Sequence, residues 1–334
     1  MKILIAGANG FVGTALIKAL IKEGHEITAL SRQKKKSSKK DKLTWVQGDL
    51  LEAESLPKIG KFDKAFYLVH GLKDEVSSFE YHESLTAVNF INWIRPSGAG
   101  VVYLGALVPK ISDLSPHLRS RQLTGAILGA SGLGVLEFRA SIILGEGSLS
   151  FEMIKAMAHR FPIRPDFKVL NSLSQPLSLE DLLKYLKASL QYLPKGHEII
   201  EIGGPETVTY GELLDLYAEL SGLIRVKIKI PEVDPRIILK ALDYTIPEHA
   251  EIGKKLTISL EHSTIVTDDS AKRIFPDIRP MSLKESMDQA RQRSTSQYAS
   301  LWEKDFLKDL LSDKILASSG LLTPELLKSF LKRR

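Results

Sequence analysis

Met1-Lys-Ile-Leu-Ile-Ala6 runs directly into Gly7-Ala-Asn-Gly-Phe-Val-Gly13, and these residues give the strongest indication of the fold. The first part is an apolar run typical of a buried parallel strand, and the spacing of Val12, Leu16 and Leu20 predicts a helix after the glycines. A strand that turns through glycines into a helix is suited to phosphate, because the backbone approaches the ligand and the helix start offers N–H groups. The stretch therefore predicts a bound dinucleotide. The residues expected to contact it are Gly7, Asn9, Gly10, Phe11, Val12 and Gly13.

The glycine spacing is G-x-x-G-x-x-G rather than the commoner G-x-G-x-x-G. Glycines alone also occur in ordinary strand–helix turns, which is the alternative interpretation. The position of these glycines, after an apolar strand and at the start of a helix, favours the nucleotide site.

Short apolar runs alternate with helical patterns through the first half of the chain. This alternation predicts an α/β fold, a Rossmann-type doubly wound parallel sheet with a smaller C-terminal substrate lobe and a helical tail. The expected strands lie at 2–6, 26–30, 43–47, 64–69, 101–104 and 135–140, and the expected helices at 12–23, 74–94 and 117–131. The expected domains are a Rossmann core at 1–145, a substrate-side lobe interleaved with the last strands at 146–295 and the tail at 296–334.

The amino-acid composition excludes some kinds of chemistry and some kinds of partner. The chain has 334 residues and no cysteine, so disulfides and thiolate chemistry are excluded. Its histidines lack metal-ligand spacing, its apolar runs are too short to span a membrane, and a cytoplasmic location is expected. The net charge of +6 is concentrated in residues 32–42 and 332–334. These runs lack interleaved aromatic residues, so nucleic acid is not an expected partner, whereas the helical tail could dock on the body or on a partner protein.

Cofactor choice is decided at the end of the second strand. An acidic residue there would favour NAD, whereas a cation would accept the 2′-phosphate of NADP. This chain has Ser31 and Arg32, followed by lysines, so NADP is the expected cofactor and NAD the alternative. After the third strand, Asp49 with Leu50 is expected to contact the adenine. Asp49 is also a candidate N-cap for a helix starting at Leu51, and the two roles are compatible.

The fourth predicted strand ends at Val69 and His70. Because ligands bind at the carboxyl ends of parallel strands, Val69 is expected to pass beside the cofactor ribose. His70 would then either face the nicotinamide or hydrogen-bond a loop.

Several segments together resemble an atypical or extended short-chain dehydrogenase/reductase of the NmrA-like, NAD(P)-dependent epimerase-like kind. They cover most of residues 1–290, and the tail after about 295 has no counterpart. They include ILIAGANGFVG, ALSR, VQGDLLEAESL, FDKAFYLVHGL, VVYLGAL, LSPHLRSR, ASGLGVLEFRASIILGEGS, QPLSLEDLLKYL, EIGGPETVTYGELLDLYAELSG and FPDIRPMSLKESM. The resemblance implies an oxidoreductase acting on a small molecule that the sequence does not identify.

The chain departs from this family where the family carries its catalytic Tyr-x-x-x-Lys. The tyrosine position falls on His117 and the lysine position on Arg121, and the fifth strand ends at Ala106 without the usual hydroxyl. His117 could serve as proton donor, with Arg121 on the same helix face. The alternative is that the active site has been lost. The resemblance then implies a non-catalytic nucleotide-bound protein, either a redox sensor like the NmrA-like regulators or a scaffold like the accessory subunit of respiratory complex I. A sugar-nucleotide epimerase is less favoured, because that chemistry relies on the same tyrosine.

Overall fold

The computed structural model describes residues 1–70, 79–109, 114–160, 163–165, 168–223, 226–228 and 262–294. The chain divides into two compact units. Unit 1 comprises residues 1–144, 175–207 and 263–286, and unit 2 comprises residues 145–174, 208–262 and 287–334. The predicted tail at 296–334 and the first five residues of the predicted helix at 74–94 lie outside the described residues.

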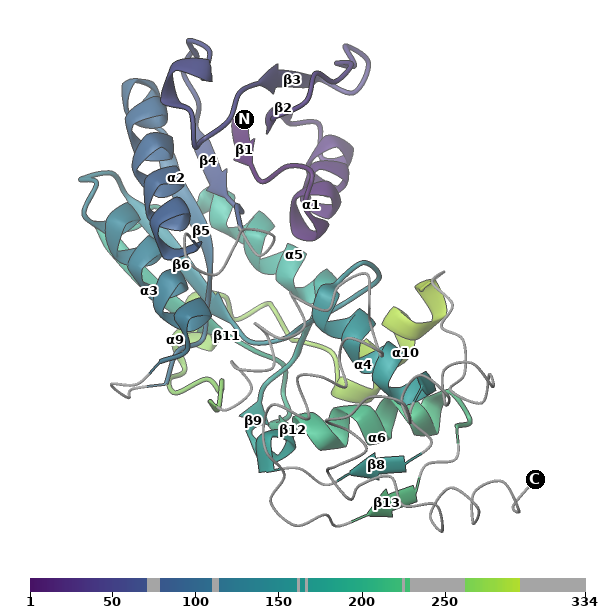
Figure 1. Cartoon of the computed structure of the whole chain (residues 1–334). Coiled ribbons are helices and arrows are strands. Elements are labelled where there is room, and N and C mark those ends of the chain that lie inside the picture. The colour runs from purple at the N-terminus through teal and green to yellow at the C-terminus, as the bar shows by residue number, and fades with distance from the viewer. Residues whose placement is uncertain are drawn as a thin grey trace, which may run out of the picture. The chain divides into compact units, whose positions relative to one another are not determined.

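Unit 1 is built on a seven-stranded sheet whose order is β11-β6-β5-β4-β1-β2-β3. All six strand pairs are parallel, which confirms the predicted doubly wound α/β class. The order runs outward from β1 in both directions, so the first strand stands near the centre of the sheet (Figure 1). The strands are β1 Lys2–Ala6, β2 Glu26–Ser31, β3 Leu43–Gln47, β4 Lys64–Tyr67, β5 Gly100–Ala106, β6 Val135–Ala140 and β11 His197–Ile202.

Each face of the sheet carries its own apolar core. Because side chains alternate along a strand, Ile3 and Ile5 enter one core, whereas Leu4 and Ala6 enter the other. Helices α1, α5 and α9 contribute to the first core, and α2 and α3 contribute to the second. Figure 1 shows α1 on one side of the sheet and α2 and α3 on the other. These helices are α1 Phe11–Lys22, α2 Phe79–Ile94, α3 Pro116–Gly129, α5 Leu179–Ala188 and α9 Ser270–Ile274.

Helix α3 begins one residue before the predicted start, at Pro116. Ser115 is its N-cap and accepts a hydrogen bond from the Leu118 N–H at 3.3 Å, and proline fits the first helical position because its missing N–H is not needed there. Shorter elements complete unit 1. They are β7 Ile143–Leu144, β10 Leu177–Ser178 and the 3-10 turns η1 Ala53–Ser55, η2 Arg95–Ser97 and η4 Ser189–Gln191.

Unit 2 has helices around a small aromatic core. Phe151 and Tyr217 pack edge to face with ring centroids 5.8 Å apart, and both side chains are buried. A capping box of Thr209 and Glu212 fixes the start of its helix α6. The elements are α4 Leu149–Arg160, α6 Tyr210–Leu220, β8 Ile163–Pro165, η3 Lys168–Asn171, β9 Leu173–Ser174, β12 Val208–Thr209, β13 Val226–Ile228 and the part of α10 Leu283–Arg293 that follows residue 286.

The described helices include none that is both long and apolar enough to cross a membrane.

Candidate functional site

The glycine turn between β1 and α1 is packed so closely that side chains are excluded on its inner side. Gly7 has a φ of +81°, and a Cβ there would lie 2.4 Å from the carbonyl oxygen of Leu68. A Cβ on Gly13 would lie 2.2 Å from the carbonyl oxygen of Gly7. Gly10 differs, because its Cβ would meet only that same oxygen, at 3.3 Å. Gly7 and Gly13 therefore shape the turn, while space beside Gly10 stays open.

The start of α1 is suited to an anion. Gly10 is the N-cap, no side chain caps the helix, and its first turn, including Phe11 and Val12, has no acidic residue. The first N–H groups of a helix lack intrahelical partners and lie at the positive end of its dipole. A pyrophosphate would supply acceptors of the right charge, so the residues present fit the dinucleotide that the fold implies.

A polar cluster joins the glycine turn to the end of β2. The Asn9 side-chain amide donates to Ser31 Oγ at 3.0 Å, and Ser31 Oγ also accepts from the Gln33 N–H at 3.2 Å. Lys35 donates to Asn9 Oδ1, and its Nζ lies 4.5 Å from the centroid of the Trp45 ring. One lysine of the basic run is therefore held against the turn by a hydrogen bond and a cation–π contact.

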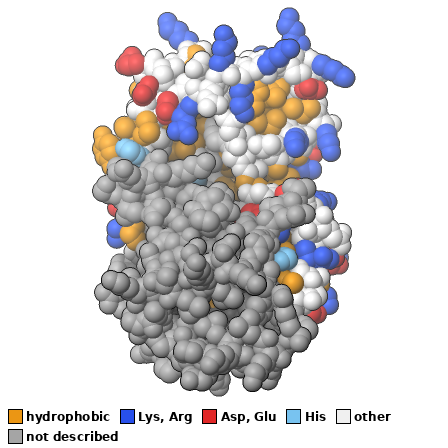
Figure 2. All heavy atoms as spheres, turned by 45° about the vertical axis from the view of Figure 1, so that its right-hand side comes forward, with side chains coloured by type: hydrophobic (Ala, Val, Ile, Leu, Met, Phe, Trp, Pro, Cys, Tyr) orange, Lys and Arg blue, Asp and Glu red, His pale blue; other side chains and the backbone are white. Residues whose placement is uncertain are grey.

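Other basic residues in this run are also exposed. Arg32 is exposed, and its carbonyl oxygen accepts from Gln47 Nε2 at 3.3 Å. Figure 2 shows separate lysine and arginine side chains projecting from the described surface. The exposed lysines of the run are Lys34, Lys35, Lys36, Lys39, Lys40 and Lys42.

Asp49 and Leu50 follow β3 in a tight turn. Asp49 Oδ1 accepts from the Leu51 N–H at 3.0 Å, and the Asp49 N–H donates to Ser55 Oγ at 2.7 Å. Leu50 is buried, and its carbonyl oxygen accepts from Asn89 of α2 at 2.7 Å. The sequence also predicts a helix starting at Leu51, with Asp49 as its cap, but only the 3-10 turn η1 forms there.

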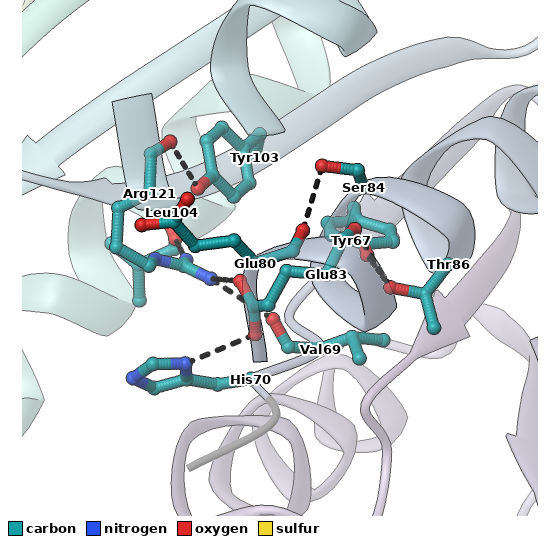
Figure 3. A network of polar contacts seen from close by, with 10 residues as sticks. All are labelled: Tyr67, Val69, His70, Glu80, Glu83, Ser84, Thr86, Tyr103, Leu104 and Arg121. Atoms are coloured by element: carbon teal, nitrogen blue, oxygen red, sulfur yellow. Dashed lines mark hydrogen bonds and ion pairs between the residues drawn. The ribbon is translucent and has the colours of Figure 1, made fainter. Parts of the chain in front are cut away.

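The buried Arg121 of α3 ties together the ends of β4 and β5. Its guanidinium donates to the Val69 carbonyl oxygen at 3.1 Å, to Glu83 Oε2 at 3.2 Å and to the Leu104 carbonyl oxygen. Burial acts to lower the pKa of Arg121, but Tyr103, Glu83 and Tyr67 offset it, so the pKa lies above its ordinary value. Arg121 is therefore a permanent cation at this edge of the sheet (Figure 3).

Glu83 of α2 stands between Arg121 and His70. Its side chain is 3 % exposed, and its Oε1 lies 3.3 Å from His70 Nδ1 while Oε2 faces Arg121. The His70 ring lies against the His117 ring, with centroids 4.9 Å apart and planes tilted by 36°. The structure thus brings His117, Arg121, Val69 and His70 together.

Two tyrosines also lie beside this cluster, but neither is available as a proton donor. The Tyr103 hydroxyl donates to the Arg121 carbonyl oxygen at 3.0 Å, and the Tyr67 hydroxyl lies 2.9 Å from Thr86 Oγ1. Both rings are buried, and burial raises the pKa of each above its ordinary value. Neither tyrosine is therefore suited to the proton transfer that the sequence predicts for His117.

The C-terminal half of helix α3 packs closely against the sheet. A Cβ on Gly125 would lie 2.3 Å from Glu137 Oε2, and one on Gly129 would lie 2.1 Å from His197 Nδ1. Glu137 is buried, with Oε1 2.6 Å from Arg139 Nε and Oε2 2.8 Å from His197 Nε2. These contacts fix the side chains of Glu137 and His197. Helix α3 can therefore come this close to the sheet only because residues 125 and 129 are glycines.

The sequence pattern alone did not predict a role for Glu83 and did not distinguish Lys35 from its neighbours. A signal for Glu83 was present, because it shares a helix face with Ala87 and Phe90, which are both buried. A carboxylate on an apolar helix face needs a cationic partner, so this pattern predicts a buried ion pair.

Comparison with known proteins agrees with this architecture. Residues 3–106 match the sequence model of the NAD dependent epimerase/dehydratase family, which confirms the predicted epimerase-like resemblance in this part of the chain. An uncharacterized protein of Saccharomyces cerevisiae is 37 % identical over 62 residues, which are 17 % of this chain and 21 % of that protein. The match thus spans about a fifth of the length of this curated relative.

Solved structures resemble the chain over a much longer span. A UDP-glucose 4-epimerase of Thermotoga maritima, determined with UDP-glucose, is 13 % identical and covers 87 % of this chain and 98 % of its own, with a TM-score of 0.64. MoeE5 in complex with UDP-glucuronic acid and NAD is 16 % identical, with the same coverage and a TM-score of 0.65. At these identities the likeness is one of fold.

Proposed function

We propose that the chain is an NAD(P)-dependent oxidoreductase that interconverts a carbonyl and a hydroxyl group on a small molecule. The observation that carries the proposal is the pair of imidazoles, His70 and His117, beside Arg121 at the carboxyl ends of β4 and β5. In doubly wound sheets this edge is where ligands bind.

The residues that would hold the cofactor lie along the same edge. The glycine turn and the start of α1, including Gly10, would take the pyrophosphate, and Asp49 with Leu50 would border the adenine. Val69 would pass beside the nicotinamide ribose. When bound, the dinucleotide supplies or accepts a hydride at its nicotinamide ring.

NADP is the proposed cofactor, with NAD as the alternative. Lys35 supports NADP because it contacts Asn9, which in turn contacts Ser31 at the end of β2. A cation at this point can pair with a 2′-phosphate, and no acidic side chain competes among residues 31–36. NAD is supported by the match to an NAD-dependent family and by the NAD bound in MoeE5.

The proton in this reaction would be exchanged by an imidazole. His117 stands at the position of the family tyrosine, and histidine gives and takes protons near neutral pH. Arg121 cannot do so, because a guanidinium stays protonated. We infer that Arg121 instead fixes the backbone at the ends of β4 and β5, through its contacts with Val69 and Leu104.

Nucleotide sugars are the first substrates to test, because two of the similar structures contain UDP-glucose or UDP-glucuronic acid. The experiment combines calorimetric titration with NADPH and NADH and a screen of NADPH oxidation over aldehydes, ketones, quinones and keto forms of UDP-sugars. We expect NADPH to bind and at least one carbonyl to be reduced. Absence of NADPH and NADH binding would refute the proposal.

A second candidate is a non-catalytic NAD(P)H-bound sensor or scaffold. The observation that favours it is that the Arg121 guanidinium, at the position of the family lysine, is already engaged by Glu83 and two backbone carbonyl oxygens. A chain that binds NADPH, yet oxidises it no faster than buffer across the whole panel, would be assigned to this class.

A further inference from the structure

Glu83 is a buried carboxylate with a fixed position. Arg121 donates to its Oε2 at 3.2 Å, and Arg121 is itself held by the carbonyl oxygens of Val69 and Leu104. A buried carboxylate is stable only when it is paired and hydrogen-bonded, so the contact with Arg121 favours the carboxylate form of Glu83 and holds its side chain in place. The other oxygen, Oε1, is directed at His70 (Figure 3).

This carboxylate sets the proton arrangement of the His70 ring. An ionised carboxylate can only accept, so the 3.3 Å contact requires a proton on His70 Nδ1. In the neutral ring the lone pair then belongs to Nε2, on the opposite side of the imidazole. In the charged ring, Nε2 also carries a proton, and Glu83 stabilises the imidazolium. The stacked ring of His117 limits the remaining freedom of the His70 ring.

We propose that His70 is a further catalytic residue, that it takes the proton-exchanging role in place of His117 and acts on the substrate through Nε2, and that Glu83 is the positioning residue that fixes its tautomer. The proposal rests on the proposed oxidoreductase function and assigns the proton step within it. The side chain of His70 is 29 % exposed, whereas that of Glu83 is 3 % exposed, so the dyad has one partly accessible and one buried member. A carboxylate that orients a histidine is a recurring solution to this problem in enzymes.

The proposed proton transfer through His70 can serve both reduction of a carbonyl and oxidation of an alcohol. In reduction, the His70 Nε2–H bond would break to protonate the carbonyl oxygen, while the carbonyl carbon gains its new C–H bond from the hydride that a bound nicotinamide would supply. The product is an alcohol with oxidised cofactor, and the neutral ring then takes a proton from water. In oxidation, neutral Nε2 accepts the hydroxyl proton as the hydride leaves the carbon.

The first test needs neither cofactor nor substrate. Long-range nitrogen–proton NMR of the full chain at alkaline pH distinguishes the two neutral tautomers of His70, with His70→Gln used to assign the signals. We expect a proton on Nδ1. In Glu83→Gln, Arg121 would hold the amide oxygen and the amide NH2 would face His70, so the proton should move to Nε2. Glu80→Gln is the matched control on the same helix, because Glu80 is paired with the exposed Arg119, and it should leave the spectrum unchanged.

The second test is kinetic, on a carbonyl that the wild type reduces. His70→Gln should lower kcat by about 10²–10⁴-fold with the NADPH Kd changed by less than threefold. His117→Phe keeps an aromatic ring against His70 and should lower kcat by less than about tenfold. Glu83→Gln should lower kcat more than it raises KM.

Several outcomes would overturn the inference. These are a neutral wild-type His70 with its proton on Nε2, a Glu83→Gln spectrum identical to that of wild type, or a His70→Gln variant as active as wild type. An active wild type with an active His70→Gln variant refutes only the role of His70, whereas a wild type inactive on the whole panel refutes the proposed function as well. If Glu83→Gln does not fold, the wild-type NMR spectrum still tests the tautomer of His70, and the activity of His70→Gln still tests its catalytic role.

Discussion

Replacing Gly10 with alanine should separate the stability of the glycine turn from its ability to bind a cofactor. Gly10 has φ −74° and ψ 173°, a conformation open to any residue, and its added Cβ would meet one atom, the Gly7 carbonyl oxygen at 3.3 Å. Alanine lowers the entropy of the unfolded chain, which stabilises by about 0.4–1 kcal/mol. It is a poorer N-cap than glycine by roughly 0.5–1 kcal/mol. The two effects offset each other, so the free energy of unfolding should change by less than about 1 kcal/mol.

Cofactor binding should respond very differently. A methyl group on Gly10 would stand where the pyrophosphate approaches the first N–H groups of α1, and a hydrogen bond stretched beyond about 3.5 Å is lost. Loss of one charge-assisted hydrogen bond of about 1.5–3 kcal/mol would raise the NADPH Kd by roughly ten- to a hundredfold. NADH should weaken equally, because the two cofactors share the pyrophosphate.

Two further glycines complete the series. A Cβ on Gly13 would lie 2.2 Å from the Gly7 carbonyl oxygen, where ordinary contacts begin at 3.4 Å. Because the obstructing atom is backbone, Gly13→Ala should destabilise the fold by about 1–3 kcal/mol or more and also abolish cofactor binding. Gly60→Ala is the control, since a Cβ there would meet no atom within 4 Å.

The measurements are thermal unfolding of the variants without cofactor and calorimetric titration with NADPH and with NADH. Gly10→Ala with wild-type stability and wild-type NADPH affinity would show that the turn does not cradle the pyrophosphate. Gly13→Ala with wild-type stability would refute the packing argument itself.

Three other predictions follow from the described contacts. Arg32→Ala and Lys35→Ala should each weaken NADPH by about tenfold or more, with NADH nearly unchanged; calorimetry that finds equal losses for both cofactors would show that neither residue reads the 2′-phosphate. His117→Ala should slow NADPH-dependent reduction at least about tenfold if the imidazole pair serves the reaction, and turnover equal to wild type would remove His117 from it. Burial lowers the pKa of Lys64 in the folded chain. As pH rises toward the ordinary value of 10.5, the unfolded chain therefore keeps the Lys64 proton longer than the folded chain does. The stability of wild type relative to Lys64→Met should therefore increase with pH in urea unfolding, and a flat difference would contradict the pKa direction.

The sequence was sufficient to predict the parallel sheet and the glycine turn, because both depend on local sequence patterns. Strands such as β1 are continuous apolar runs, and Gly7 to Gly13 need no distant partner to be identified. The position of His117 and Arg121 on one helix face follows from the helical period alone.

The remaining features depend on contacts between distant segments. Glu83 lies 38 positions from Arg121, and the stacking of His70 on His117 joins the end of a strand to the start of a helix. Lys35 is one of several equivalent lysines in the sequence, and only the folded chain distinguishes it by its contacts with Asn9 and Trp45. These contacts are determined by tertiary packing, so a local sequence pattern does not predict them.

The close seating of α3 has a consequence for attempts to alter the substrate range. Gly125 and Gly129 bring the helix down onto Glu137 and His197, and Arg121 bonds its N-terminal half to the ends of two strands. A larger side chain at either glycine would tilt the helix and displace His117. Directed-evolution libraries should therefore leave both glycines unchanged and place their diversity in elements that are not seated on the sheet.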